Sequence, residues 1–401
     1  MKLLQDVRAS YWFLPTVMAI LAVILAQLTL FLDHNNIVLT DAWRTTQVDG
    51  ARSTLAVISQ SVIGVTGVMF SMTIVAVSFA SGNFGPRLIG NFMRDRGNQL
   101  SLGILIATFV FTLLILRSVQ ASYGGGDESN AFVPHLSMLV AFGLTGVSVI
   151  TMIYYVHHIP EIINVSNISA DLGERLRWAI ETLIKNESPA EGETISNLPD
   201  SPADCQIFLK GDGYLQTWDR DQLSALAQEN DLYFELLFTA GSFVTQHSPA
   251  LNVWGKQDLS EDVDNDIRSC FALGHIPTEQ QNLLFIVQQL VEMIARALSP
   301  GVNDPYTALN CLNWLYVGLI TAANYEGGLQ PRRFDRVKYP TLNFGTLFEA
   351  SITVALPYIK TDPMVSEHLN KLLNRLVTET VSEDVISVTK KVRSEVAALQ
   401  D

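Results

Sequence analysis

The chain has 401 residues, of which 48% are hydrophobic and only 16% are charged. Soluble proteins average about 25% charged residues, so the composition excludes an intrinsically disordered chain and a purely soluble one. The net charge of -14 is unevenly divided: residues 1–160 carry 8 basic and 7 acidic groups, whereas residues 161–401 carry 18 basic and 33 acidic groups and would repel the phosphates of a nucleic acid.

Four apolar stretches are long enough to cross the roughly 30 Å hydrocarbon core of a bilayer. They cover about residues 11–32, 55–80, 100–116 and 136–156. Each is expected to be a helix, because no water inside the bilayer can satisfy a free backbone. The first is predicted to be a retained span, since Pro15 and Gln27 interrupt it and no small-residue cleavage site follows. Residues 1–160 are therefore predicted to form a four-helix transmembrane domain.

Basic residues in the short loops predict the orientation of this domain. Five of them lie in the N-terminal tail and in the loop after the second span: Lys2, Arg8, Arg87, Arg94 and Arg96. By the positive-inside rule, both termini are expected in the cytoplasm. None of the four spans contains Asp, Glu or Lys, which disfavours a transporter that couples transport to protons or sodium.

The second span carries two polar lines at helical spacing. A helix over residues 55–80 would be about 39 Å long at 1.5 Å per residue. The first line contains Gln60, Gly64, Gly67, Ser71 and Ser78, and the second contains Ser59, Thr66 and Thr73. Small residues let helices approach closely and hydroxyls bond across them, so one interpretation is helix packing. The other is that the first line forms the wall of a wet pathway between subunits.

The sequence after Pro160 is predicted to begin with an amphipathic helix and a linker within residues 161–203. Apolar residues recur at three- and four-residue steps between Ile168 and Leu183, and residues 186–202 are rich in Glu, Ser, Pro and Gly. Residues 204–258 are then predicted to form a small α+β unit in the order β-β-α-β-β. Its strands are expected at 205–209, 214–218, 233–238 and 251–254, and its helix at 219–228.

Residues 259–401 are predicted to be helical. Thr278 and Gln281 have the spacing of a capping box that opens one helix. Asp304–Pro305 and Asp362–Pro363 each place a cap before a proline at the first helical position. The expected fold is therefore mostly α, a four-helix transmembrane module followed by an α+β cytoplasmic domain with a strand-rich unit and a helical bundle.

Groups that could carry chemistry are few. The spacings of Cys205, Cys270 and Cys311 match no zinc pattern, and these thiols are expected to be reduced core residues. Adjacent histidines on a helix point about 100° apart, so His157 and His158 cannot easily share one metal ion; an interfacial or packing role is the main interpretation, with metal or proton sensing as the other. No nucleotide-binding or hydrolase motif is present. We expect no metal, no cofactor and no enzymatic activity.

One polar segment interrupts two strongly apolar helices between Arg296 and Ala308. Its distinctive residues are Arg296, Ser299, Pro300, Asn303, Asp304, Pro305 and Thr307. Asn303 and Asp304 are expected to cap the second helix, and the loop is expected to be enclosed by packing. A helix–helix corner is the structural interpretation, and a binding loop for a ligand or a neighbouring subunit is the functional one.

This segment resembles the RALSP-x-x-NDP-x-TA signature of a bacterial predicted-membrane-protein family, domain of unknown function 2254. The similarity extends over nearly the whole chain, through Tyr11–Pro15, Met69–Ser81, the Pro86-Arg87 pair with Phe92 and Asp95 downstream, Gly213–Leu223 and Gly241–Leu251. The resemblance implies four spans and a cytoplasmic domain in the bacterial inner membrane. It supplies no reaction and no catalytic residues.

Two functions fit these observations, and an enzyme is a third and weaker hypothesis. The first is a homo-oligomeric channel or pore in which the second spans surround a pathway and the acidic cytoplasmic domains concentrate cations. The second is a membrane-anchored scaffold or sensor that binds a ligand or partner. The expected partners are membrane lipid, further copies of the chain and, for the pore, cations.

Overall fold

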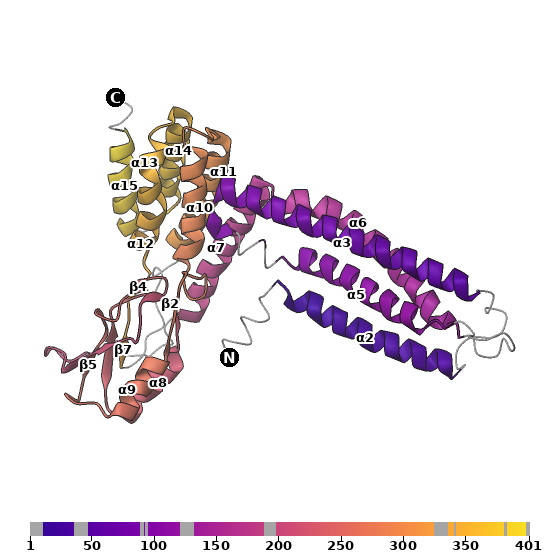
Figure 1. Ribbon diagram of the computed structural model, residues 1–401. Helices are drawn as coiled ribbons and strands as arrows, with labels where there is room; N and C mark the ends of the chain where they lie inside the picture. Colours follow the sequence, from indigo (N-terminus) through magenta and orange to yellow (C-terminus); the bar gives the residue numbers. More distant parts are fainter. Residues whose placement is uncertain are drawn as a thin grey trace. The chain divides into compact units, whose positions relative to one another are not determined.

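The computed structural model of the protein describes residues 11–35, 47–88, 92, 95–120, 132–187, 198–324, 336–340, 342–380 and 383–397. The chain divides into two compact units, an N-terminal unit of residues 1–167 and a C-terminal unit of residues 168–401. Figure 1 shows both units, and each is described by itself below.

The N-terminal unit contains four long helices, each long and apolar enough to cross a membrane. They are α2 (Phe13–His34), α3 (Val48–Phe84), α5 (Arg96–Ser118) and α6 (His135–Ile162), and a short 3-10 turn, η2 (Pro86–Leu88), follows α3. All four predicted spans are therefore confirmed as helices, and the structure extends each of them at one or both ends. The α3 helix is extended most, from the predicted residues 55–80 to Val48–Phe84.

Helix α5 forms the centre of this unit. Half of its most apolar window is buried, compared with 22–28% for the other three helices. Its side chains Leu105, Phe111 and Ile115 are buried and pack against residues of α2, α3 and α6, and Figure 1 shows α5 among these helices. The four predicted spans therefore pack together in one compact unit, as the expected fold class requires.

Polar contacts tie the helix ends together at the end of the unit where α2 finishes and α6 begins. The Asp33 carboxylate accepts hydrogen bonds from the backbone N–H groups of Leu136 (2.8 Å) and Ser137 (2.9 Å), and so caps a different helix from its own. The Arg52 guanidinium donates to the Val119 carbonyl oxygen at 2.9 Å. These contacts satisfy helix termini that have no partner within their own helix.

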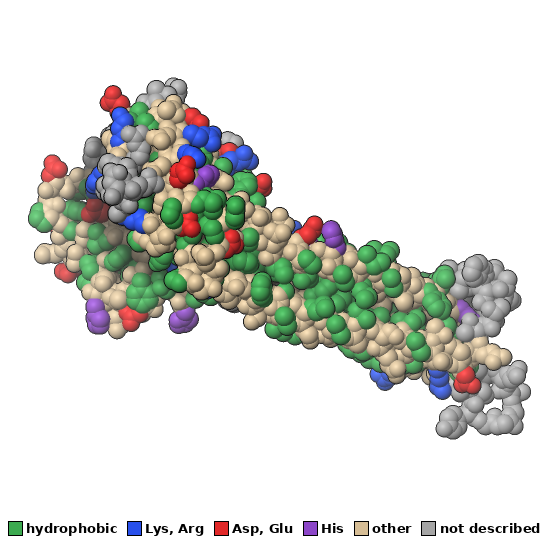
Figure 2. Space-filling model, turned by 90° about the horizontal axis from the view of Figure 1, so that it is seen from above, with side chains coloured by type: hydrophobic (Ala, Val, Ile, Leu, Met, Phe, Trp, Pro, Cys, Tyr) green, Lys and Arg blue, Asp and Glu red, His purple; other side chains and the backbone are tan. Residues whose placement is uncertain are grey.

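The outer surface of the helices is apolar. Side chains such as Val75 and Ile150 are each 68% exposed, and Figure 2 shows hydrophobic side chains along most of this unit with charged groups near its ends. A surface of this kind has lipid as its natural surroundings, since soluble proteins rarely expose such large contiguous apolar areas.

The C-terminal unit begins within α7 (Val165–Glu187) and continues into two small sheets. The first sheet has the strand order β1 (Cys205–Phe208), β5 (Pro249–Trp254), β3 (Tyr233–Leu236) and β7 (Val337–Lys338). The second has the order β4 (Phe243–Val244), β2 (Gly213–Trp218) and β6 (Phe271–Gly274). Helices α8 (Arg220–Glu229) and α9 (Glu261–Ser269) complete this region around buried side chains that include Phe234, Leu251 and Ile267.

The remainder of the C-terminal unit is a helical bundle. Its elements are α10 (Leu284–Ala297), α11 (Pro305–Ala323), α12 (Phe344–Phe348), a π-helical turn (Glu349–Thr353), α13 (Val354–Ile359), α14 (Pro363–Glu379) and α15 (Glu383–Ala397). Asp304 and Asp362 cap α11 and α14 with a proline at the first helical positions, as predicted. The mostly α fold class, with sheets confined to a small region, is confirmed.

Two expectations about this unit differ from the structure, and a third lies largely outside the residues that it describes. Strands β6 and β7 lie in the region predicted to be purely helical, because their partners β2 and β3 are distant in sequence and give no local signal. The capping box is wrong: α10 begins at Leu284, and Gln281 has a φ of 55° and pairs with the Trp218 backbone instead. The predicted linker at 186–202 lies largely outside the described residues.

Candidate functional site

The structure separates the two polar lines of α3. All members of the first line are exposed on the outer surface of the helix: Gln60, Gly64, Gly67, Ser71 and Ser78. A Cβ added at Gly64 or Gly67 would meet no atom within 4 Å. Packing within one chain is therefore not the role of this line, which we call the α3 face.

The second line faces the interior of the unit. Ser59, Thr66 and Thr73 are 5–6% exposed. The Thr66 hydroxyl donates to the Val62 carbonyl at 2.6 Å, and the Thr73 hydroxyl lies 3.0 Å from the Met69 carbonyl. Since a hydroxyl that bonds to its own helix needs no water, these residues can be buried at low cost.

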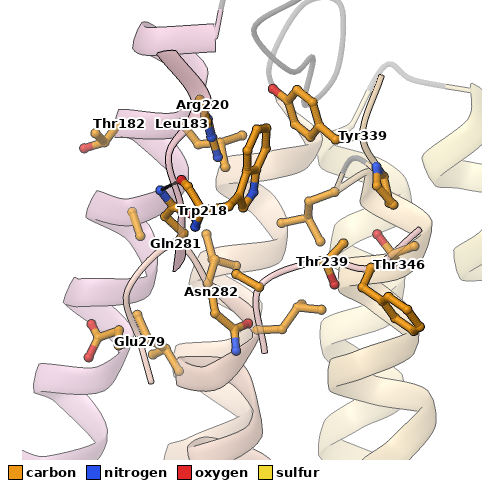
Figure 3. Close-up of a pocket in the computed structure, with 18 of the residues that line it drawn as sticks. Thr182, Leu183, Trp218, Arg220, Thr239, Glu279, Gln281, Asn282, Tyr339 and Thr346 are labelled. Atoms are coloured by element: carbon orange, nitrogen blue, oxygen red, sulfur yellow. Dashed lines mark hydrogen bonds between the residues drawn. The ribbon is translucent and has the colours of Figure 1, made fainter. Parts of the chain in front are cut away.

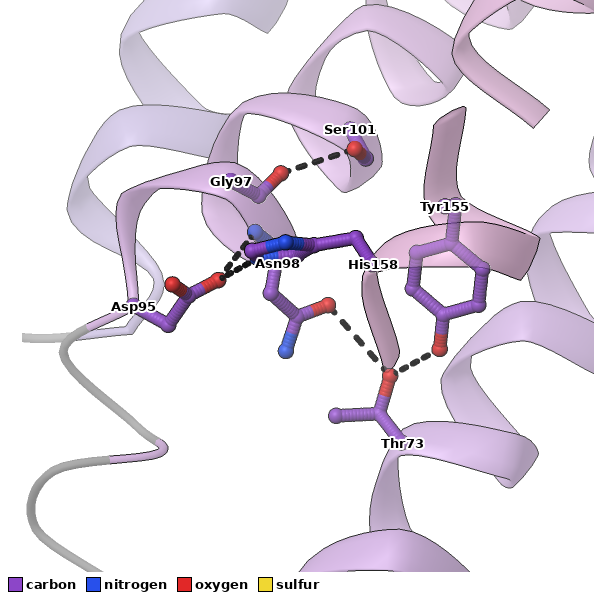
Figure 4. A network of polar contacts seen from close by, with 7 residues as sticks. All are labelled: Thr73, Asp95, Gly97, Asn98, Ser101, Tyr155 and His158. Atoms are coloured by element: carbon purple, nitrogen blue, oxygen red, sulfur yellow. Dashed lines mark hydrogen bonds and ion pairs between the residues drawn. The ribbon is translucent and has the colours of Figure 1, made fainter. Parts of the chain in front are cut away.

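Thr73 belongs to a buried polar network near one end of the N-terminal unit (Figure 4). Its hydroxyl oxygen lies 2.5 Å from the Tyr155 hydroxyl and 3.4 Å from the Asn98 side-chain oxygen. The Tyr155 hydroxyl also lies 2.6 Å from the Met69 carbonyl. The network joins α3, α5 and α6, and the cost of leaving its polar groups unpaired would be high in this surrounding.

An aspartate–histidine pair lies next to this network. The Asp95 carboxylate accepts a hydrogen bond from the Asn98 backbone N–H at 2.7 Å and so caps α5, and the same carboxylate oxygen lies 2.9 Å from His158 Nε2. A carboxylate has only acceptor sites, so the hydrogen of this contact belongs to His158 Nε2. The His158 ring stacks on Tyr154 with centroids 5.0 Å apart.

Gly97 makes this close arrangement possible. A Cβ at this position would lie 2.5 Å from the Tyr154 hydroxyl oxygen and 2.6 Å from His158 Nε2. By contrast, His157 is 80% exposed and pairs with Glu161 at 3.4 Å. The two adjacent histidines therefore have different surroundings, and sequence reasoning missed the partners of His158 because Asp95 is 63 residues away.

The polar segment between α10 and α11 is a helix–helix corner with local hydrogen bonds. The Asp304 carboxylate accepts from the Thr307 backbone N–H (3.2 Å) and from its hydroxyl (2.5 Å), while the Ser299 hydroxyl donates to the Arg296 carbonyl (2.6 Å). Asn303 has a φ of 50° and an exposed side chain, so it forms the turn and does not cap α11.

Two expectations about this corner are therefore wrong: Asn303 does not cap α11, and the loop is not enclosed. The tip is exposed at Pro300 through Asn303, and Tyr306 is 74% exposed, so the loop is not enclosed by packing. The Arg296 guanidinium pairs with Glu292 one turn back in α10, at 3.4 Å, and Pro305 occupies the first turn of α11. Two exposed side chains of this corner, Val302 and Tyr306, are large and hydrophobic.

The cysteines are separate from one another, and none of them is in a disulfide. Burial raises the pKa of the Cys270 thiol to about 11 and that of the Cys311 thiol to about 12. No group of three or more His, Cys, Asp or Glu side chains that could hold a metal ion occurs among the residues that the structure describes.

Comparison with known proteins gives a family and several relatives. The family described as "Predicted membrane protein (DUF2254)" matches residues 8–375. "Uncharacterized protein Rv1290c" of Mycobacterium tuberculosis (strain ATCC 25618 / H37Rv) and "Uncharacterized protein Mb1321c" of Mycobacterium bovis (strain ATCC BAA-935 / AF2122/97) are each 28% identical over 340 residues. The alignments cover 82% of this chain and 64% of each relative, so the chain spans under two thirds of their length. No solved structure matches the chain.

Proposed function

The chain belongs to the DUF2254 family of predicted membrane proteins, and we propose that it is a homo-oligomeric ion channel or pore whose pathway is lined by α3. In this proposal the protein lies in the bacterial inner membrane with both termini in the cytoplasm. It has no enzymatic activity, and its partners are lipid, further copies of the chain and cations, with no nucleic acid.

The exposed α3 face carries the proposal. Gln60 follows the charged residue Arg52 by eight residues, which places it about 12 Å further along α3 at 1.5 Å per residue. Gln60 is exposed there. An amide in hydrocarbon without a hydrogen-bond partner costs about 2–7 kcal/mol. Contact with water or with another subunit removes that cost, and the open space beside Gly64 and Gly67 allows a close neighbour.

The polar residues of this face are suited to a narrow wet surface. The Ser71 hydroxyl donates to the Gly67 carbonyl at 2.9 Å, so its oxygen can still accept a hydrogen bond from water. A ring of subunits would place several copies of this face around one axis. The excess of 15 acidic groups after Pro160 in each subunit would then attract cations at one mouth of the pathway.

A pair of leucine substitutions tests the proposal. Gly67→Leu fills the open space on the α3 face, whereas Met72→Leu changes an exposed side chain that points about 140° away on the same helix. The particle mass is measured in detergent and in nanodiscs, and cation flux is measured in liposomes. We expect a wild-type oligomer that conducts, an intact Gly67→Leu oligomer without flux, and a Met72→Leu variant that behaves as the wild type.

Three results would contradict the proposal. A wild-type particle that is monomeric in both environments excludes a shared pathway, and normal flux through Gly67→Leu excludes the α3 face as its wall. A preference for chloride in reversal potentials under a salt gradient contradicts the role of the acidic unit. An oligomer without any current would favour the membrane-anchored scaffold or sensor.

A further inference from the structure

The C-terminal unit contains a cavity of about 1080 Å³ (Figure 3). Its walls come from one face of α7, the end of β2 with the start of α8, the loop after β3, the residues leading into α10, and the segment before α12. Small-molecule sites usually occupy about 300–1,000 Å³ and have mostly apolar walls with a few polar groups. This cavity has the size and construction of such a site.

An ion pair closes one side of the cavity. The Arg175 guanidinium of α7 pairs with the Glu279 carboxylate, and it also pairs with Asp171 at 3.1 Å. The two carboxylates raise the pKa of Arg175 against the opposing effect of its burial. The Glu279 carboxylate is thus committed to Arg175 and does not present a negative charge to a ligand.

An arginine backed by two aromatic rings lies on another side. The Arg220 guanidinium carbon is 5.5 Å from the Trp218 ring centroid and 5.4 Å from that of Tyr339, and the two rings meet edge to face at 5.2 Å. Contact with ring faces fixes the guanidinium plane, and the N–H groups that recognise carboxylate or phosphate lie in that plane. The arrangement places a positive charge beside flat apolar surfaces.

Hydrogen bonds to its backbone hold Trp218 in place. Gln281 accepts a hydrogen bond from the Trp218 backbone N–H at 3.1 Å and donates to its carbonyl at 3.0 Å. Trp218 is only 5% exposed and packs in the core of the strand-rich region, so its ring stays in place behind Arg220. The aromatic corner is therefore formed before any ligand binds.

A buried amide completes the polar part of the lining. Asn282 is 8% exposed, lines the cavity and lies among the drawn side chains of Figure 3. Its side-chain amide has one oxygen that accepts and two N–H groups that donate hydrogen bonds. A ligand with a polar edge can therefore form hydrogen bonds to Asn282 within the cavity.

We propose that this cavity is a binding site for a planar aromatic organic anion. The partly exposed Tyr339 ring contacts its aromatic body, Arg220 binds its carboxylate, sulfonate or phosphate, and Asn282 bonds to a polar group on the ring. A cationic ligand does not fit, since Glu279, the one acidic side chain among the described lining residues, is paired with Arg175. This site lies wholly within residues 168–401 and does not depend on the proposed pore.

The test uses the full chain in nanodiscs and isothermal titration calorimetry, with empty nanodiscs as the blank. The anionic probes are adenosine monophosphate, 1-naphthoate and indole-3-acetate, and the neutral analogues are adenosine and 1-naphthol. Arg220→Gln removes the charge in the cavity. Arg177→Gln is the matched control, because Arg177 lies on α7, is 55% exposed and pairs with Glu181 outside the cavity lining.

We expect at least one anion to bind with a Kd below 1 mM and at least tenfold more tightly than its neutral analogue. Arg220→Gln should weaken that anion at least tenfold and leave the neutral analogue unchanged, and Arg177→Gln should bind as the wild type does. If Arg220→Gln does not fold, Arg220→Lys replaces it, with an expected loss that is smaller but measurable. Failure of all three anions at 1 mM, or equal binding by wild type and the Arg220 variant, overturns the site, whereas the flux assay of Gly67→Leu reports on the pore alone.

Discussion

Two neighbouring residues in the corner between α10 and α11 stabilise the protein for different physical reasons. Asn303 has a φ of 50° and an exposed side chain, and its backbone N–H donates to the Ser299 carbonyl at 3.0 Å. The left-handed conformation costs a residue with a Cβ about 1–2 kcal/mol, and Asn and Gly pay least. Asn303→Ala should therefore lower the free energy of unfolding by about 1 kcal/mol, and Asn303→Gly should leave it nearly unchanged.

Asp304 stabilises the start of α11 through its side chain. Its carboxylate accepts the Thr307 N–H at 3.2 Å, which otherwise has no partner within the helix. Loss of such a cap costs about 0.5–2 kcal/mol when alanine replaces it. A change of 1 kcal/mol shifts the melting temperature of a domain of 150–250 residues by about 2–4 °C, so both alanine variants should melt a few degrees below the wild type.

Differential scanning fluorimetry of the full chain in detergent measures these shifts. Tyr306→Ala, at a side chain that is 74% exposed in the same turn, serves as the control and should melt as the wild type does. If Asn303→Gly loses as much stability as Asn303→Ala, then a side-chain contact and not the backbone conformation stabilises the corner. If Asp304→Ala melts unchanged while an activity is lost, the segment is a recognition loop.

Three further predictions concern the C-terminal unit and its connection to α7. Gly173→Ala should lower the melting temperature, because the added Cβ would lie 2.7 Å from the Trp314 Cβ and overpacking costs about 1–3 kcal/mol. Gly146→Ala, where an added Cβ would meet nothing within 4 Å, should melt as the wild type does. Equal melting of the two variants would refute the packing argument. Because burial raises the pKa of Cys311 to about 12 and that of Cys270 to about 11, maleimide at pH 7 should label Cys205 first, and rapid native labelling of Cys311 detected by mass spectrometry would contradict this. Burial and the nearby Lys371 lower the pKa of His368 from its usual 6.5. The unfolded state therefore binds a proton at His368 more readily, and the free energy of unfolding should fall as the pH drops below 6.5. Urea unfolding at pH 7.5 and 5.5 should show this loss in the wild type and a smaller one in His368→Gln.

Local signals were sufficient for the elements of the N-terminal unit. Length and apolarity predicted α2, α3, α5 and α6, because a helix in a bilayer must satisfy its own backbone and needs no distant partner. Helix caps at Asp219, Asp304 and Asp362 were equally predictable, since the capping carboxylate and the N–H groups that it accepts lie within three residues of each other. The signal failed at Thr278 and Gln281, where a long-range pairing with Trp218 replaced the local cap.

Periodicity also separated the two polar lines of α3 but did not decide which one is buried. Both lines contain small polar residues, and only the packing of α5 and α6 against Thr73 and not against Ser71 distinguishes them. Asp95 and His158 are 63 positions apart, and the residues that pair β6 with β2 and β7 with β3 are at least 53 positions apart. The cavity around Arg220 likewise combines distant segments, from α7 to the segment before α12. Such contacts arise from the way whole elements pack, and a single sequence records the period of each helix or strand without recording its neighbours.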